Sequence, residues 1–446
     1  MEQNKNISVF SLAWPIFFQI LLAMALGYVD TAMMSHYSKT AVGALGNANQ
    51  IMNFLALAFS IVASATGVVS AQYLGAGKMS HMNQIYTLSI AFNLGLSLIV
   101  SALIILLRVP LLLAMRVPEN MTADAAAYMQ ITGYSLFAVA ITSTFSQIFN
   151  CNKNTLLGLV IAIGMNLFNI LGNYLFLYGS FSFLNLGIRG VAISTCASRI
   201  LGMFSGFIFF YVVIKGRISL KYINPFPFSL LKKLIKLGIP TAGENISYNI
   251  AQILISAFVN TMGAVPLTAK IFCSILTGFS LVYSNAMAGA TAIITGHAIG
   301  RDDYDFAYRR VWKSLFIAII VSVSVAMLNW LLSPHSLKLF TEDENIVSLG
   351  SKVMFIAVFL EAGRCVNLVI IQSMRASGDV VFPTLLGICS MWGVSVLFSW
   401  FLGIYLKMGL VGVWISMAAD EVLRALIVIG RWKLGLWRGK SVVEKS

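Results

Sequence analysis

Long runs of apolar residues dominate the pattern of the chain. A helix that crosses the hydrocarbon core of a membrane needs about 20 such residues, and runs of that length recur from one end of the sequence to the other. The pattern predicts twelve membrane-spanning helices, centred near residues 22, 58, 95, 137, 167, 200, 247, 282, 322, 361, 393 and 420. The sequence lacks the period-two alternation of a membrane β-barrel. We therefore expect an all-α integral membrane protein.

The composition agrees with that pattern. Of the 446 residues, 59% are hydrophobic and only 10% are charged, and the mean hydropathy is +0.86, far from the values of soluble globular domains. The five cysteines stand singly, without a CxxC motif or a histidine at metal-ligand spacing, so we expect neither a disulfide nor a metal cluster. The sequence also lacks GxSxG, HExxH and Walker A motifs. We therefore expect no enzyme and no cofactor, and energy for pumping has to come from an ion gradient.

The formal net charge of +14 is concentrated on one side of the predicted helices. Six basic residues lie between Lys215 and Lys236, four lie between Arg301 and Lys313, and five follow Gly430, whereas the opposite loops carry few. Because cytoplasmic loops are enriched in lysine and arginine, this asymmetry predicts a multi-pass protein of the inner (plasma) membrane with both termini in the cytoplasm. The surplus charge suits contact with the anionic headgroups of the lipid bilayer, and we expect no nucleic-acid partner.

The two halves of the chain repeat one another. SAQYLGAGK, which ends at Lys78, corresponds to TGHAIGRDD, which ends at Asp303. Three pairs of matching residues share a separation of 225: Pro15 and Pro240 (240 − 15), Gly75 and Gly300 (300 − 75), and Glu119 and Glu344 (344 − 119). Each copy holds six predicted helices, an even number, so both copies enter the membrane from the same side and the repeat is parallel. We predict an N-terminal six-helix bundle at 1–214, a cytoplasmic linker at 215–233, and a C-terminal six-helix bundle with a basic cytoplasmic tail at 234–446.

Asp30 is an acidic residue at membrane depth in the first half, directly after the apolar run FSLAWPIFFQILLAMALGYV. A carboxylate well inside a bilayer costs on the order of 3 kcal/mol, so such a residue requires a reason. The predicted helix ends near Ser35, which places Asp30 about five residues, or roughly 8 Å, below the outer end of the helix. Arg199 is the nearest basic candidate for an ion pair, about one turn deeper on a later helix. The carboxylate of Asp30 is therefore expected either to form an ion pair with Arg199 or to belong to a coupling site.

Three further polar residues are predicted at the depth of Asp30. Asn169 and Asn173 share one face of the predicted helix from Thr155 to Tyr178, and Thr195 lies at a similar depth on the next helix. A carboxylate, two carboxamides and a hydroxyl at one level can bind Na⁺ through oxygen atoms, or a proton on the carboxylate. We therefore predict a cation-coupling site at these four residues, with hydrogen bonding between helices as the alternative role of the asparagines.

Four charged residues of the second half are additional candidates: Glu244, Lys270, Glu361 and Asp420. Glu361 with Arg364, and Glu421 with Arg424, stand three residues apart, so each pair is expected to neutralise itself on one helix. Lys270 lacks a local partner and is expected to reach Glu244, Glu361 or Asp420. This set of charges is interpreted either as a gate or as a satisfied core.

The sequence GRCVNLVIIQSMRASGDVVFPTLLGICSMWG, followed by GLVGVWISMAADEVLRALIVIGRW, resembles the multidrug and toxic compound extrusion (MATE) family. VDTAMM near the start and the YLGAGK-type turn extend the resemblance over essentially the full chain. The resemblance implies two six-helix bundles around a central cavity and export of amphipathic, cationic drugs by alternating access, in exchange for Na⁺ or H⁺. It also implies that Asp30 is the acid of the coupling site, with Asn169, Asn173 and Thr195 as its partners, and that Glu244 matches an acid of the second bundle.

Two departures from the family pattern are visible. The counterpart of RASGD in the first half is NCNKN, so the charged turn exists in one half only, and Lys270 is unusual for its position. A lipid-linked precursor flippase of the same superfamily is the alternative within transport, although such proteins carry several basic residues in their cavity. A passive channel is the alternative outside it, although the acids lie at different depths and not in a ring. We expect a monomer that carries small-molecule drugs or toxic organic cations.

Overall fold

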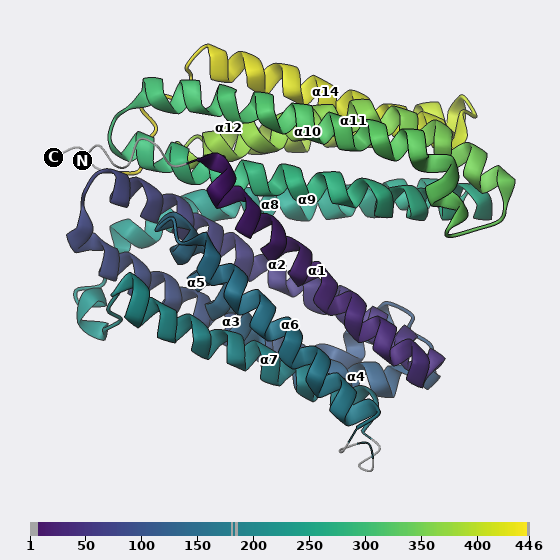
Figure 1. The fold of residues 1–446 in the computed structure, drawn as a ribbon, viewed down its shortest axis with the longest axis horizontal. Coiled ribbons are helices and arrows are strands. Elements are labelled where there is room, and N and C mark those ends of the chain that lie inside the picture. The colour runs from purple at the N-terminus through teal and green to yellow at the C-terminus, as the bar shows by residue number, and fades with distance from the viewer. Residues whose placement is uncertain (1–7, 180–181, 183–185, 444–446) are drawn as a thin grey trace. The chain divides into compact units, whose positions relative to one another are not determined.

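The computed structural model describes residues 8–179, 182 and 186–443, and within these residues the chain is helical without any strand (Figure 1). The first half contains α1 (Val9–Tyr37), α2 (Lys39–Gly75), α3 (Met82–Ala114), α4 (Glu119–Gly133), α5 (Leu136–Cys151), α6 (Thr155–Leu177) and α7 (Ile188–Phe209), and the second contains α8 (Phe228–Asn260), α9 (Ala264–Gly300), α10 (Tyr304–Lys338), α11 (Glu344–Ala376), α12 (Val381–Ser390), α13 (Leu397–Trp400) and α14 (Gly409–Lys433). Short 3-10 helices occupy Met79–His81 (η2) and Leu220–Ile223 (η5), and π-helical turns occupy Phe210–Ile214 (η4), Met391–Val396 (η6) and Phe401–Tyr405 (η7).

The helices agree with the predicted membrane spans. Among the described residues, nine segments are long and apolar enough to cross a membrane, and the bent pair of α4 and α5 makes a tenth. The other two predicted spans are α8 and α14, which carry more charged residues. The segment from α12 to η7 counts as one span, Val381–Tyr405. The predicted all-α membrane fold is therefore confirmed, and ten of the twelve predicted spans have a counterpart among these segments if the bent pair counts as one.

The internal repeat is visible in the helix ends. Both α2 and α9 contain 37 residues, and their first and last residues are each separated by 225 (264 − 39 and 300 − 75). The start of α4 and the start of α11 have the same separation (344 − 119), as do the end of α5 and the end of α11 (376 − 151). The broken pair α4–α5 thus corresponds to the continuous helix α11.

The break between α4 and α5 bends this span by 51°, which the sequence pattern had not indicated. Gly133 and Ser135 lie at the break, and glycine–serine pairs are a common cause of helix kinks. Two side-chain hydroxyls compete for backbone carbonyls there: Thr132 Oγ1 donates to Tyr128 O (2.7 Å), and Ser135 Oγ donates to Thr132 O (2.8 Å). These local bonds offer the carbonyls an alternative to the helical ladder.

The chain forms two compact units, here called the first and second bundles. The first consists of Trp14–Leu74 and Lys78–Gly238, and the second consists mainly of the chain from Ile239 on. Each bundle has its own apolar core, with Phe59 and Met129 in the first and Ile255 and Met354 in the second. The bounds predicted from the sequence, 1–214, 215–233 and 234–446, remain a prediction.

Large apolar side chains also cover the outer surface of the helices. Leu106 is 74% exposed, Phe316 is 68% exposed and Ile253 is 67% exposed. Apolar surface of this extent is typical of a protein that interacts with lipid. The exposed faces therefore agree with the membrane-spanning role of the helices.

In the second bundle, the chain beyond α14 folds back onto the turn between α11 and α12. Trp437 is fully buried and stacks on Trp432, with ring centroids 4.0 Å apart and planes 7° from parallel. The buried carboxylate of Asp379, in that turn, accepts from Arg431 Nε (2.7 Å) and from Lys440 Nζ (2.6 Å). The segment that follows α14 is therefore part of the folded bundle.

Candidate functional site

The carboxylate of Asp30 lies in the interior of the first bundle and is only 2% exposed. Its Oδ1 atom accepts a hydrogen bond of 2.6 Å from Asn173 Nδ2 on α6, and its Oδ2 atom accepts one of 3.2 Å from Thr195 Oγ1 on α7. Both donors are uncharged. In the part of the chain that the structure describes, the acid is therefore held by hydrogen bonds between helices and not by a salt bridge.

Asn169 completes this group of four residues. Its Oδ1 atom accepts from Asn173 Nδ2 (3.3 Å), and its Nδ2 atom donates to Thr195 Oγ1 (3.2 Å). Asn169 and Asn173 lie on one face of α6 because they are four residues apart, and both are fully buried. The structure thus brings together the four residues that the sequence had placed at one depth.

Close packing of α6 against α7 makes this arrangement feasible. A Cβ atom at Gly172 would lie 2.3 Å from Ser194 Oγ, so a larger residue at this position of α6 would require the Ser194 side chain to move. Ser194 Oγ in turn donates to the backbone carbonyl of Asn169 (2.9 Å). The two helices therefore approach closely at the residues that contact Asp30.

Arg199 does not form an ion pair with Asp30 within the described part of the chain. Its Nη1 atom donates to Ser135 Oγ (3.2 Å) and to Thr132 O (3.4 Å) instead, at the break between α4 and α5. The guanidinium thus supplies a donor to backbone and side-chain oxygens at the kink. The alternative in which Arg199 neutralises Asp30 through an ion pair is therefore wrong.

The group of four residues offers several oxygen atoms to a small cation. Asn173 Oδ1 is buried and has no hydrogen-bond partner among the described residues, although buried amide oxygens are normally paired. Carboxylate and carbonyl oxygens are the ligands that hard cations prefer. The residues present are therefore compatible with Na⁺ as well as with a proton on Asp30.

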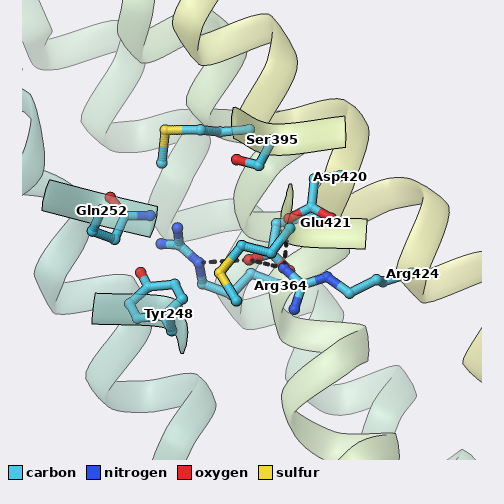
Figure 2. Close-up of a pocket in the computed structure, with 9 residues that line it drawn as sticks. Tyr248, Gln252, Arg364, Ser395, Asp420, Glu421 and Arg424 are labelled. Carbon is cyan, nitrogen blue, oxygen red and sulfur yellow. Dashed lines mark hydrogen bonds and ion pairs between the residues drawn. The ribbon is translucent and has the colours of Figure 1, made fainter. Parts of the chain in front are cut away.

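The second bundle contains a network of five charged side chains, of which Figure 2 shows Arg364, Asp420, Glu421 and Arg424; the fifth is Glu361. Arg364 on α11 pairs with Glu361 (2.6 Å) and, through Nε, with Glu421 Oε1 on α14 (3.5 Å). Arg424 pairs with the same Glu421 oxygen (3.1 Å) and with Asp420 (2.9 Å). The two predicted local pairs are confirmed, and they are joined through Glu421.

A close approach between α11 and α14 lets this network form. A Cβ atom at Gly363 would lie 2.8 Å from the backbone carbonyl carbon of Glu421, so the helix backbones come together at this point. Asn367, one turn further along α11, donates to Glu421 Oε2 (2.7 Å) and to Glu421 O (2.8 Å). The position of Glu421 is thus fixed from both sides.

The expected partners of Lys270 are corrected by the structure. Lys270 Nζ donates to Ser256 Oγ, and no carboxylate among the described residues lies within ion-pair distance of it. Glu244, one of the acids that Lys270 was expected to reach, pairs with Arg375 Nη2 (2.5 Å). A neutral hydroxyl therefore takes the place of the predicted acid.

Sequence reasoning also missed the role of the MRASGD turn. Arg375, at its start, contacts Glu244 on α8, and Asp379, at its end, contacts Arg431 and Lys440. The two ends of one short turn thus connect three parts of the second bundle. The sequence distinguished this turn only as a motif, because its partners lie 52 to 131 residues away.

Comparisons with known proteins agree with this architecture. Two stretches of the chain, residues 15–175 and 240–401, match the MatE family, and their starts differ by the predicted repeat length of 225 (240 − 15). The "Uncharacterized transporter YisQ" of Bacillus subtilis is 36% identical over 439 residues, which cover 98% of this chain and 96% of that protein. The "Probable multidrug resistance protein NorM" of Thermotoga maritima is 22% identical over 438 residues, which cover 98% of this chain and 94% of that protein.

Solved structures of transporters share the fold. A MOP superfamily transporter from Pyrococcus furiosus superposes with a TM-score of 0.87 at 18% identity, covering 96% of this chain and 95% of that one. The MATE transporter VcmN of Vibrio cholerae, in its bent form, superposes with a TM-score of 0.88 at 18% identity, covering 96% of each chain. The family match over both halves, together with the full-length relatives, shows that this chain belongs to the multidrug and toxic compound extrusion (MATE) family of membrane transporters.

Proposed function

We propose that this protein is a cation-coupled antiporter that exports amphipathic organic cations by alternating access, with Asp30 as the coupling acid. Relatives named multidrug resistance proteins support small-molecule export. The duplicated six-helix pattern supports alternating access, because two equivalent bundles can rock against one another. Either Na⁺ or H⁺ entering the cell down its gradient supplies the energy.

One observation carries the proposal: Asp30 is a buried carboxylate whose hydrogen-bond donors within the described residues are all neutral. An ionised group in such a place is costly unless its charge is balanced. Binding of one cation removes that cost and so favours conformations in which the site is closed. Release of the cation on the cytoplasmic side restores the charge, which links the ion to the conformational cycle.

The two ions make different demands on the same residues. A proton needs only the carboxylate of Asp30 itself. Na⁺ needs several oxygens, which Asn169, Asn173 and Thr195 can supply, including the buried Asn173 Oδ1 atom that lacks a partner among the described residues. One positive charge that crosses the full membrane potential gains about 2.3 kcal/mol per 100 mV with either ion, which is sufficient to drive uphill export.

We also propose that the protein is a monomer in the inner (plasma) membrane, with both termini in the cytoplasm. The distribution of lysine and arginine supports this orientation. In this orientation Asp30 lies in the outer half of the membrane, where it is loaded from outside and discharged after the conformational change.

Transport of ethidium by proteoliposomes tests the proposal. Wild type, Asp30→Asn and Asp124→Asn are compared under an imposed Na⁺ gradient and, separately, under a proton gradient. Asp124 is an exposed residue of α4, so its variant receives the same chemical change in the same bundle without touching the site. We expect one gradient to drive efflux in wild type and Asp124→Asn, and neither gradient to do so in Asp30→Asn.

Three outcomes are distinguishable. Gradient-driven efflux that survives in Asp30→Asn at the wild-type rate contradicts the coupling role of Asp30. Wild-type flux that depends on neither gradient and shows no counterflow identifies a passive channel. The gradient that drives wild-type efflux identifies the coupling ion.

A further inference from the structure

Residues 215–236, here called the basic segment, connect α7 to α8 and carry positive charge that the chain does not neutralise. The segment belongs to the first bundle. Its exposed basic residues are Lys215, Arg217, Lys221, Lys232 and Lys236. Within the described part of the chain, none of these five side chains forms an ion pair. Their counter-ions therefore come from outside the protein.

Hydrogen bonds hold the basic segment against the start of α3. The backbone N–H of Arg217 donates to Asn83 Oδ1 (2.9 Å), and that of Ser219 donates to Thr87 Oγ1 (3.4 Å). Ser219 Oγ in turn accepts from the backbone N–H of Lys221 (3.3 Å). Because backbone groups make these bonds, the charged ends of Arg217 and Lys221 remain exposed. The segment is therefore a fixed surface of the bundle and not a loose tether.

The few acids of the first bundle lie elsewhere. The bundle contains Asp30, Glu119 and Asp124, and the sequence then has no further acid before Glu244. Asp30 is buried, and the other two follow the end of α3, whereas the basic segment packs at its start. With 33 residues, α3 is about 50 Å long, so its two ends lie on opposite sides of a membrane. This distribution explains why the segment lacks acidic partners.

Large apolar side chains stand among the charges of the basic segment. Leu220 is 77% exposed, Phe226 is 43% exposed and Phe228 is 73% exposed. The rings of Phe226 and Phe228 pack edge to face, with centroids 4.7 Å apart. All three residues follow the membrane-spanning segment that ends at Ile214. Exposed apolar side chains with a polar rim mark a surface that contacts a membrane or another protein.

The length of α8 places the basic segment at the membrane surface. With 33 residues α8 is about 50 Å long, whereas the hydrocarbon core of a bilayer is about 30 Å thick. The start of α8 is the end that projects, because Lys232 and Lys236 are exposed there while Leu230 and Leu234 are buried. An amphipathic segment with exposed rings and lysines is favoured at the level of the lipid headgroups.

The second bundle treats its basic residues differently. Arg438 pairs with Asp305 (2.9 Å), and the pairs of Asp379 with Arg431 and Lys440 neutralise the chain beyond α14. Acids of the chain thus serve as counter-ions there. Unpaired charge combined with exposed rings is a property of the basic segment.

We propose that the basic segment is an anchor for anionic phospholipids. Its basic side chains contact the headgroup phosphates, and Leu220, Phe226 and Phe228 enter the boundary between headgroups and acyl chains. Binding of this kind combines burial of apolar surface with attraction to anionic lipid. An acidic soluble partner would match the charges but would leave the apolar side chains in water. The inference goes beyond the proposed export function, because it involves neither Asp30 nor an ion gradient.

Hydrogen–deuterium exchange of the full-length transporter tests the anchor. The protein is placed in nanodiscs of phosphatidylcholine alone, or of phosphatidylcholine mixed with phosphatidylglycerol, whose headgroup is anionic. We expect the backbone amides of residues 220–229 to exchange at least about fivefold more slowly with phosphatidylglycerol, the factor for one basic residue that engages an anionic surface. The turn at residues 301–303, between α9 and α10, is the internal control and should change much less.

Two multiple variants separate the charges from the apolar side chains. Arg217→Gln/Lys221→Gln/Lys232→Gln removes three charges and keeps the rings. Leu220→Ser/Phe228→Ser removes apolar surface and keeps every charge. Each variant should lose the effect of phosphatidylglycerol on residues 220–229, because the anchor needs both kinds of contact.

A matched variant of the second bundle controls for the loss of charge. Arg301→Gln/Arg309→Gln/Lys313→Gln also removes three exposed basic side chains, and it should keep the full effect of phosphatidylglycerol on the basic segment. All replaced side chains are exposed, so every variant should unfold at the wild-type temperature in phosphatidylcholine nanodiscs. Thermal unfolding checks this.

Three results would overturn the anchor. Equal slowing in the basic segment and in the control turn would show that the surface potential of the membrane acts on both. A full effect of phosphatidylglycerol in Leu220→Ser/Phe228→Ser would show that the apolar side chains do not enter the membrane. Glycerol phosphate, the soluble headgroup, is added to phosphatidylcholine nanodiscs as the last arm, and protection equal to that of the lipid would assign the segment to a soluble phosphate compound.

Discussion

Asn173 Nδ2 and Asp30 Oδ1 are 2.6 Å apart, and this hydrogen bond connects α6 to α1 across the interior of the first bundle. The two residues are 143 positions apart in the sequence and four other α-helices lie between them, so the contact depends on the tertiary fold. A donor so close to an ionised oxygen makes a charge-assisted bond, which is stronger than a neutral one. The strength of this bond should therefore depend on the charge of Asp30.

A double-mutant cycle tests that dependence. Asn173→Ala should destabilise the wild-type protein by about 1.5–3 kcal/mol, the value of a hydrogen bond to a charged group. In the Asp30→Asn background the loss in the free energy of unfolding caused by the same substitution should be smaller by at least about 1 kcal/mol, because the charge is gone. Reversible unfolding in detergent measures both effects. Equal losses in the two backgrounds would show that Asn173 packs beside Asp30 without stabilising its charge.

Arg199 should act through the helix break and not through Asp30. Arg199→Met removes a donor from Thr132 O and Ser135 Oγ, so we expect a loss of about 1–3 kcal/mol in the free energy of unfolding. Since Arg199 and Asp30 are not within ion-pair distance and interact only through a longer-range attraction, the loss should be nearly the same in wild type and in Asp30→Asn. A smaller loss in the Asp30→Asn background, measured by the same unfolding assay, would support an ion pair after all.

The charge balance of the second bundle predicts an asymmetry between acids and arginines. Glu421→Gln leaves two acids and two arginines, with the Glu361–Arg364 and Asp420–Arg424 pairs intact. Arg364→Met leaves three acids and one arginine, and an uncompensated buried charge costs about 3–5 kcal/mol. Arg364→Met should therefore unfold at a clearly lower temperature than Glu421→Gln. Similar unfolding midpoints for the two variants would show that the charge balance of the network does not determine the thermal stability of the protein.

Asp379 should control the accessibility of the chain beyond α14. In Asp379→Asn the attraction to Arg431 and Lys440 is weakened, so trypsin should cleave after Lys440 faster than in wild type. Digestion followed by mass spectrometry measures the rate, and Glu344→Gln, which removes an exposed acid elsewhere in the second bundle, is the control. Unchanged cleavage in Asp379→Asn would show that other contacts, such as the buried Trp437 and the Arg438–Asp305 ion pair, hold this segment.

Most of the fold could be predicted from hydropathy and repetition. The apolar runs indicated the positions of the long helices, and the observed midpoint of α9, residue 282, coincides with the predicted centre. The kink between α4 and α5 could not be predicted in this way, because the apolar run continues through Gly133 and Ser135. The kink coincides with local hydrogen bonds from the Thr132 and Ser135 hydroxyls to backbone carbonyls, and a hydropathy profile does not reveal such bonds.

The candidate sites were predictable to different degrees. The grouping of Asp30 with Asn169 and Asn173, the proposed coupling site, followed from spacing, since the two asparagines share a helical face and helix length gives the depth of Asp30. The partner of Lys270 did not follow, because Ser256 is one of many neutral hydroxyls and has no sequence signal. The Glu244–Arg375 pair was missed for a related reason: 131 residues separate the partners, and only tertiary packing selects one arginine among several.

The buried Trp437 has a practical consequence for work with this protein. A purification handle or fluorescent reporter joined directly after α14 would replace a side chain that fills the interior of the second bundle, and would also remove Lys440 from Asp379. Loss of a buried tryptophan costs about 3–5 kcal/mol of stability. A poor yield from such a fusion would therefore result from the missing side chains and not from instability of the intact transporter. Fusions at this end should therefore begin after Val443.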